Sequence, residues 1–165
     1  VLNASAETSA SYTVFGGAGA DTITGGRGGD ALWGRQGADT LTGGAGNDVF
    51  AYFDAADSTA GRRDTITDFA RGDLIDVSRL GVSRFVAGAF TADGSGQIRA
   101  TQVAASSANW LVESDIDGNG TTDLTILVTA GSAYAWASVD FNLGVPPTSS
   151  GGMSFHPADS LALVA

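Results

Sequence analysis

The chain has 165 residues, which is enough for one domain with a substantial core or for two small ones. It carries 18 acidic residues against 8 basic ones, and this net charge of −10 argues against nucleic acid or an anionic membrane as a partner. The absence of cysteine excludes a disulfide framework and thiolate zinc sites, and no apolar run approaches the roughly 20 residues of a membrane-spanning helix.

Residues 16–51 consist of four consecutive nine-residue repeats: GGAGADTIT, GGRGGDALW, GRQGADTLT and GGAGNDVFA. Glycine permits a tight turn and leaves backbone carbonyls open to a ligand, whereas the last three residues of each repeat favour a short strand. Each repeat is therefore predicted to be half a coil, with its eighth residue pointing between two facing sheets. A flexible linker would not keep this register through four units. The sixth places hold Asp21, Asp30, Asp39 and Asp48, and the eighth places hold Ile23, Leu32, Leu41 and Phe50.

Stacking of these coils is predicted to bring carboxylates together. Repeats two apart lie on the same edge at the strand spacing of about 4.8 Å, so Asp21 is expected beside Asp39, and Asp30 beside Asp48. Two such carboxylates repel by about 1 to 3 kcal/mol unless a cation lies between them. Oxygen ligands favour calcium, and a core this thin suggests that folding depends on it. Further expected calcium-site residues are Asp57, as a third-ion partner of Asp39, and Gly17, Gly19, Gly26, Gly28, Gly34, Gln36, Gly43 and Ala45 in the turns.

The nonapeptide resembles the calcium-binding repeat of the RTX (hemolysin-type) family. Residues 64–80, DTITDFARGDLIDVSRL, resemble the segment that follows the repeats in serralysin-type proteases and in alginate epimerase R-modules. The resemblance implies that Asp64 closes the last calcium site. It also implies a secreted bacterial protein that leaves the cell through a type I (ABC) exporter and folds in extracellular calcium. The residues alone predict two strands joined by the turn ARGD, with Ile66 and Ile75 inward. For Asp68, Asp73 and Asp76, a role as ligands and a role as caps of turns and strand ends are equally open.

The chain is β-rich from residue 97 onward, where QIRATQV, NWLVES, LTILVT and AWASVDFNL have strand composition. The predicted fold is all-β: a parallel β-roll of calcium-binding nonapeptide repeats over residues 1–63, continued and capped by a C-terminal β-sandwich over residues 64–143. Residues 144–165 are predicted to be a linker and a C-terminal secretion signal, and VDFNL at 139–143 is the alternative signal.

The segment DIDGNGTTD, residues 115–123, has a pattern similar to part of an EF-hand loop. Asp115, Asp117, Asn119 and Asp123 fall at loop positions 1, 3, 5 and 9, but Ile126 stands where a bidentate glutamate is needed. A calcium site and a hairpin turn that bonds its own backbone therefore both remain open.

Catalytic motifs are missing from the sequence. His156 is the only histidine, and there is no H-E-x-x-H, G-x-S-x-G or P-loop. The chain is predicted to be a non-catalytic, secreted module that supports export and calcium-triggered folding. The second hypothesis is an extracellular polysaccharide-binding, adhesive or surface-layer module, since Arg27, Arg35 and Trp33 lie close together in the repeats.

Overall fold

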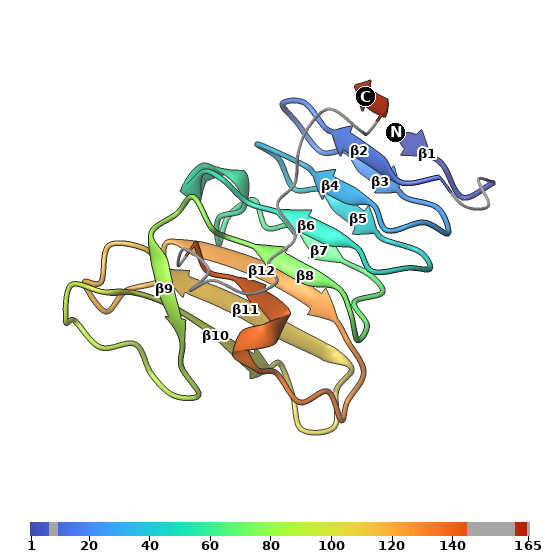
Figure 1. Ribbon diagram of the computed structural model, residues 1–165. Coiled ribbons are helices and arrows are strands. Elements are labelled where there is room, and N and C mark those ends of the chain that lie inside the picture. The colour runs from blue at the N-terminus through green and yellow to red at the C-terminus, as the bar shows by residue number, and fades with distance from the viewer. Residues whose placement is uncertain (7–9, 145–160, 165) are drawn as a thin grey trace, which may run out of the picture.

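The computed structural model describes residues 1–6, 10–144 and, for the backbone only, 161–164. In these residues the chain forms two facing sheets (Figure 1). The eight-stranded sheet has the order β1 (Leu2–Asn3), β3 (Thr22–Thr24), β5 (Thr40–Thr42), β7 (Thr65–Ile66), β12 (Leu124–Thr129), β11 (Asn109–Asp115), β10 (Gly96–Gln102) and β9 (Val82–Phe85). The six-stranded sheet has the order β13 (Phe141–Asn142), β8 (Leu74–Asp76), β6 (Val49–Ala51), β4 (Ala31–Trp33), β2 (Tyr12–Phe15) and β14 (Leu161–Val164).

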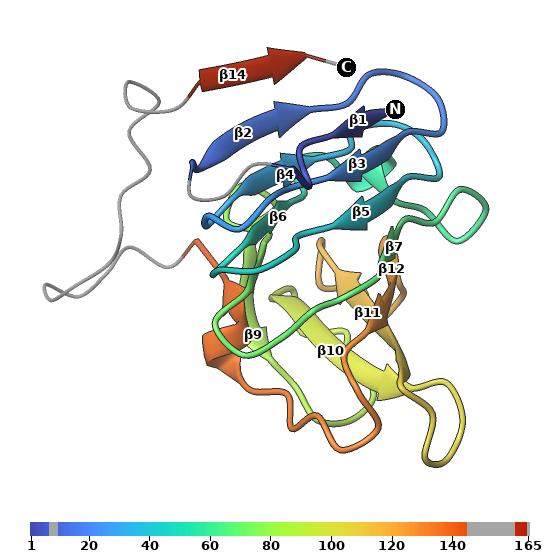
Figure 2. The same cartoon turned by 90° about the vertical axis from the view of Figure 1, so that its right-hand side faces the viewer.

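Successive repeats alternate between the two sheets, as the nine-residue pattern predicts. Strands two apart pair in parallel, with Ile23 opposite Leu41 and Leu32 opposite Phe50. Figure 2 shows the resulting stack of coils. All four eighth-place side chains are fully buried, and so are Ile66 and Ile75, which confirms their predicted inward orientation.

The stacking continues beyond the four repeats, but after an insertion. Strand β7 lies on β5 with Ile66 opposite Leu41, and β8 lies on β6 with Ile75 opposite Phe50. Asp21 and Asp39, which contact each other in neighbouring coils, are 18 residues apart, whereas Asp39 and Asp64 are 25 apart. Seven extra residues are therefore inserted between the fourth repeat and β7. They form a short 3₁₀ helix, Ala55–Asp57, and a loop closed by the pair Thr59 and Arg62.

The C-terminal strands extend the eight-stranded sheet. Strands β10, β11 and β12 are antiparallel to one another, and β12 pairs in parallel with β7 of the roll. The three strands predicted within 97–129 are thus confirmed, whereas the strand predicted over 135–143 is wrong except for β13. A 3₁₀ helix, Ser138–Asp140, forms there because the Asp140 carboxylate accepts the backbone N–H of Ala137 at 2.7 Å and the Tyr134 hydroxyl at 2.8 Å.

The C-terminal strand β14 lies beside β2, at the opposite end of the six-stranded sheet from β13. The predicted linker and most of the predicted secretion signal fall in 145–160, outside the described residues. Within the described part of the chain, no helix is long and apolar enough to cross a membrane.

Candidate calcium sites along the roll

Aspartate side chains link each coil to its neighbour along both edges of the roll. On one edge, Asp39 Oδ1 accepts the backbone N–H of Asp21 at 2.7 Å, and Asp64 Oδ1 accepts that of Asp39 at 2.8 Å. This row of Asp21, Asp39 and Asp64 is called edge A. The sequence-predicted neighbours Asp21 and Asp39 are therefore in contact.

The opposite edge repeats the arrangement with one more step. Asp30 Oδ1 accepts the N–H of Tyr12 at 2.8 Å, Asp48 Oδ1 accepts that of Asp30 at 2.8 Å, and Asp73 Oδ1 accepts that of Asp48 at 2.9 Å. The row of Asp30, Asp48 and Asp73 is called edge B. The predicted pair Asp30 and Asp48 is also in contact.

Three carboxylate oxygens on these edges are buried without a hydrogen bond of normal geometry among the described residues: Oδ2 of Asp39, Asp48 and Asp64. The buried Tyr52 hydroxyl, which is also without such a bond, lies close enough to Asp64 to lower its pKa. In the first two repeats the corresponding oxygens are satisfied, because Gly17 and Gly26 donate their N–H groups to Asp21 and Asp30. A buried oxygen that lacks a partner costs about 1 to 3 kcal/mol. Carboxylate oxygens of this kind are ligands that calcium prefers, although a full calcium site takes six to eight oxygens.

The fourth repeat shows why Asp48 loses its local partner. The N–H groups of Gly43 and Gly44 both donate to the carboxylate of Asp68, at 2.9 and 2.8 Å. Asp68, which belongs to the following coil, thus covers the turn of the fourth repeat. In the third repeat the corresponding place is held by Arg35, whose φ of 68° is in the left-handed region that glycine normally adopts.

Burial and mutual repulsion disfavour ionisation of these groups. Burial, reinforced by the charges of Asp39 and Asp57, raises the pKa of Asp64 to about 8. Burial, together with the charges of Asp73, Asp30 and Asp68, raises the pKa of Asp48 to about 6. The pKa values of Asp39 and Asp73 are also raised, mainly by burial. No arginine in the described part of the chain forms a salt bridge with these four residues, so protein cations do not compensate their charge.

The turns of neighbouring coils approach closely at the predicted backbone positions. The Gly26 carbonyl accepts the Ala45 N–H at 3.0 Å, and the Gln36 carbonyl accepts the Gly19 N–H at 2.8 Å. These bonds hold consecutive turns together on each edge. The ligand roles of the turn residues, Gly17, Gly19, Gly26, Gly28, Gly34, Gln36, Gly43 and Ala45, stay predictions.

The predicted stacking of Asp57 on Asp39 is wrong, because the seven inserted residues shift the register and bring Asp64 to that place. Asp57 lies in the 3₁₀ helix, where its Oδ2 accepts the Trp33 indole N–H at 2.9 Å and the Phe53 N–H at 3.0 Å. Its charge still acts on Asp39 and Asp64, so it lies near edge A.

Asp73 is the edge residue that was not included among the predicted ligands. It is buried, and its second carboxylate oxygen accepts the Ala70 N–H at 2.8 Å. A signal for it was present in the sequence, because Asp64 and Asp73, like Ile66 and Ile75, are nine residues apart. The nonapeptide period therefore resumes after the insertion.

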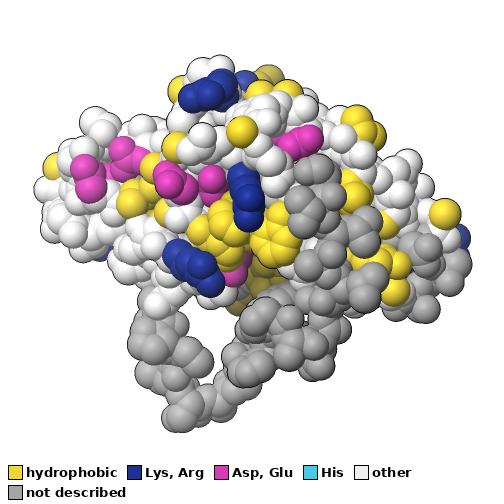
Figure 3. All heavy atoms as spheres, turned by 90° about the horizontal axis from the view of Figure 1, so that it is seen from above, with side chains coloured by type: hydrophobic (Ala, Val, Ile, Leu, Met, Phe, Trp, Pro, Cys, Tyr) yellow, Lys and Arg dark blue, Asp and Glu magenta, His cyan; other side chains and the backbone are white. Residues whose placement is uncertain are grey.

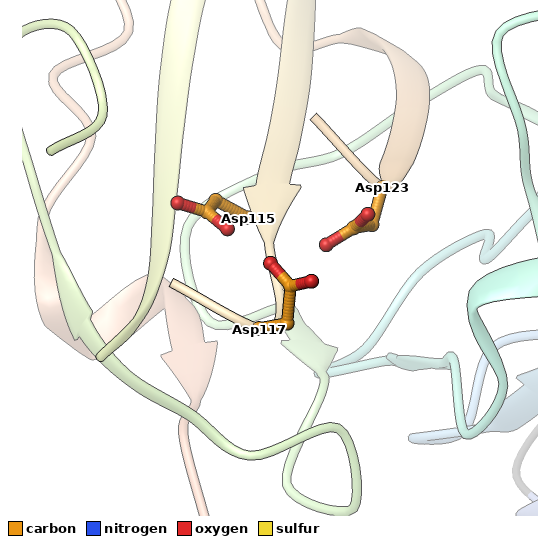
Figure 4. Close-up of side chains that lie close together, drawn as sticks. All are labelled: Asp115, Asp117 and Asp123. Carbon is orange, nitrogen blue, oxygen red and sulfur yellow. The ribbon is translucent and has the colours of Figure 1, made fainter. Parts of the chain in front are cut away.

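The loop at 115–123 brings together three carboxylates, those of Asp115, Asp117 and Asp123, within 4.8 Å of one another (Figure 4). Asp115 accepts the N–H groups of Gly118, Asn119 and Gly120 at 2.9, 3.1 and 2.8 Å. The Asn119 side chain donates to Asp117 at 2.9 Å. These bonds agree with a hairpin turn that closes on its own backbone, and the calcium site at this loop stays a prediction. No carboxylate oxygen of this loop is among the buried unpaired oxygens of the described residues.

Arginine and aromatic side chains form a row on the outer face of the six-stranded sheet. The rings of Phe15 and Trp33 lie 5.8 Å apart, and those of Trp33 and Phe53 lie 5.0 Å apart. The Arg35 guanidinium lies 4.8 Å from the Trp33 ring, and that of Arg79 lies 4.4 Å from the Phe53 ring. Arg27 makes no ring contact among the described residues. Figure 3 shows basic side chains beside hydrophobic ones on one face of the molecule.

Nine-residue half-coils with stacked turn aspartates define an RTX-type β-roll. Residues 5–141 match the family described as Peptidase M10 serralysin C terminal, and the chain belongs to this family. No curated protein matches the sequence.

The similar solved structures include two subunits of a mannuronan C5-epimerase from Azotobacter vinelandii. The AlgE6R2 subunit is 21% identical, with a TM-score of 0.42 over 84% of this chain and 94% of that one. The AlgE6R3 subunit is 24% identical, with a TM-score of 0.38 over 96% of each chain.

Proposed function

We propose that this chain is the non-catalytic, calcium-binding module of a secreted bacterial protein, and that calcium outside the cell triggers its folding after export. The observation that carries the proposal is the set of buried, unpaired oxygens on Asp39, Asp48 and Asp64. Stacking six carboxylates along two edges is unfavourable unless cations compensate their burial and mutual repulsion.

The two edges offer separate sites. Asp21, Asp39 and Asp64, with Asp57 nearby, would hold calcium on edge A; Asp30, Asp48 and Asp73, with Asp68 nearby, would hold it on edge B. Bound calcium would supply positive charge and accept the unpaired oxygens as ligands. The aspartates themselves fix the spacing of the coils through their bonds to the backbone of the next coil.

Weak calcium affinity suits a module that folds after export. Extracellular calcium modules bind with dissociation constants of about 10⁻⁴ to 10⁻³ M, well above the concentration in a cell interior. Inside the cell, repulsion between the uncompensated carboxylates would keep the roll unfolded, which is the state that a type I exporter transports. Millimolar calcium outside would shift the folding equilibrium towards the folded roll.

Calorimetric titration with calcium tests the ligand assignment. Asp48→Asn removes one charge from edge B, and we expect it to lower either the number of ions bound or their affinity. Asp54→Asn is the matched control, because Asp54 caps the 3₁₀ helix and asparagine caps equally well. Equal titration curves for the wild type and Asp48→Asn would reject edge B as a calcium site.

Deletion of residues 144–165 tests the export assignment. Secretion from a host that carries a type I exporter should be lost, whereas calcium-induced folding of the purified protein should remain. Normal secretion of the shortened chain would place the signal upstream, at 139–143.

A second function is favoured by the arginine–aromatic row, namely the binding of an anionic polysaccharide. Guanidinium groups bind carboxylates in a bidentate manner, and aromatic rings pack against sugar faces. The probe is polygalacturonate, with neutral dextran as the control ligand. The double variant Arg35→Gln/Arg79→Gln should lose affinity, whereas Arg62→Gln/Arg63→Gln, in the exposed loop, should not. Equal losses in both variants would indicate only nonspecific charge attraction.

A further inference from the structure

The C-terminal strand β14 occupies an edge that only the folded roll provides. It pairs in parallel with β2 over four positions, with Ala162 opposite Thr13 and Leu163 opposite Val14. Strand β4 lies on the other side of β2, and Figure 2 shows β14 at the end of this stack. The two paired segments are separated by almost the whole chain, so their contact requires the structure between them.

Strand β2 is itself attached to edge B. The Tyr12 N–H donates to Asp30 Oδ1 at 2.8 Å, and Asp30 in turn donates its own N–H to Asp48. The Val14 side chain is fully buried in the core between the sheets, and the Gly16 N–H donates to the Trp33 carbonyl at 2.8 Å. The position of β2, and with it the edge that receives β14, therefore depends on the carboxylate row.

We propose that β14 is a calcium-dependent cap. In the unfolded chain the C-terminal segment is free, and it joins the sheet as β14 once calcium has bound along edge B and the coils have stacked. This inference rests on the proposed calcium-driven folding. It assigns Leu161–Val164 two exclusive states, an extended segment open to an exporter and an edge strand of the folded roll. The cap also covers backbone groups of β2 that would otherwise pair with a strand from another molecule.

Cysteine cross-linking tests the cap directly, because the natural chain has no cysteine. The variant Thr13→Cys/Ala162→Cys places thiols at paired positions of β2 and β14, and Thr22→Cys/Thr40→Cys places them at paired positions of β3 and β5. Adjacent paired strands are close enough for a disulfide. Thr40→Cys/Ala162→Cys, with one thiol in each sheet, is the mismatched control.

Each variant is oxidised mildly in excess chelator and in millimolar calcium, and the products are separated on a nonreducing gel. In calcium, both matched variants should form intramolecular disulfides and the mismatched variant should form none. In chelator, Thr13→Cys/Ala162→Cys should stay reduced, whereas Thr22→Cys/Thr40→Cys can also link in an unfolded chain, because its loop is only 18 residues long. The cap is refuted if Thr22→Cys/Thr40→Cys links in calcium while Thr13→Cys/Ala162→Cys stays reduced, links only between chains, or links equally in chelator. Circular dichroism of the same samples separates the two claims, because β-structure in chelator would overturn calcium-driven folding, and the cap with it.

Discussion

Asp39 lies at the centre of edge A, where its Oδ1 holds the coil of Asp21 and its N–H is held by Asp64. Its Oδ2 is buried and unpaired among the described residues. Removal of this side chain would break the link between two coils and take a central ligand from the proposed sites.

We expect Asp39→Ala to raise the calcium midpoint of folding by about tenfold, which corresponds to about 1.4 kcal/mol. Asp117→Ala should change the midpoint much less, because that loop closes through the backbone bonds of Asp115. Calcium titrations followed by circular dichroism compare the two variants. An equal or larger shift for Asp117→Ala would make the loop at 115–123 the principal site.

The pKa of Asp64 gives a prediction with a defined sign. The carboxyl has a pKa of about 8 in the folded chain against 3.8 ordinarily, so folding without metal takes up a proton between these values. In chelator, stability should therefore be greatest at acidic pH and should fall as the pH rises from about 4 to about 8. Because the chain without calcium is expected to be largely unfolded at neutral pH, the measurement is circular dichroism in chelator between pH 8 and pH 4. The β-structure should increase as the pH falls, and β-structure that increases with pH would contradict the prediction.

At the scale of elements, the turns determine how closely the coils stack. Gly44 has a φ of 101°, and a Cβ there would collide with the Gly26 carbonyl oxygen of the coil below. We expect Gly44→Ala to destabilise the calcium-bound protein by about 1 to 3 kcal/mol, measured by urea unfolding. Gly61→Ala is the control, because a Cβ at residue 61 meets no atom within 4 Å. Equal stabilities of the two variants would show that the turns can separate without cost.

The elements of the roll were predictable because one short pattern specifies both turn and strand. The buried residues Ile23, Leu32, Leu41 and Phe50 follow directly from their place in the repeat. The insertion after the fourth repeat concealed the same pattern, so Asp57 was placed on edge A, and for Asp73 a ligand role and a cap role stayed equally open. Strand composition also failed over 135–143, because side-chain bonds to Asp140 favour a 3₁₀ turn over an extended strand.

At the scale of the whole molecule, the roll and the antiparallel strands share one sheet. The Leu127 N–H donates to the Asp64 carbonyl at 2.9 Å, and the Ser58 hydroxyl donates to the Thr125 carbonyl at 2.6 Å. The residue that closes edge A is thus bonded to β12, the C-terminal strand that pairs with the roll. Calcium binding on the roll should therefore order β10, β11 and β12 as well.

Tryptophan fluorescence tests this coupling. Of the three tryptophans, Trp33 lies in the roll, and Trp110 and Trp136 lie in the C-terminal part. In Trp33→Phe, the fluorescence of the remaining two should change at the same calcium concentration as the circular dichroism of the whole chain. A change at a clearly different concentration would mean that the two parts fold independently.

The most direct test of calcium-driven folding is circular dichroism of the wild-type chain in excess chelator and then in millimolar calcium. We expect little β-structure in chelator and a cooperative gain of it on adding calcium. Magnesium should substitute poorly, because it demands tight octahedral geometry. A chain that is fully folded in chelator, and whose melting temperature does not change with calcium, would contradict the account.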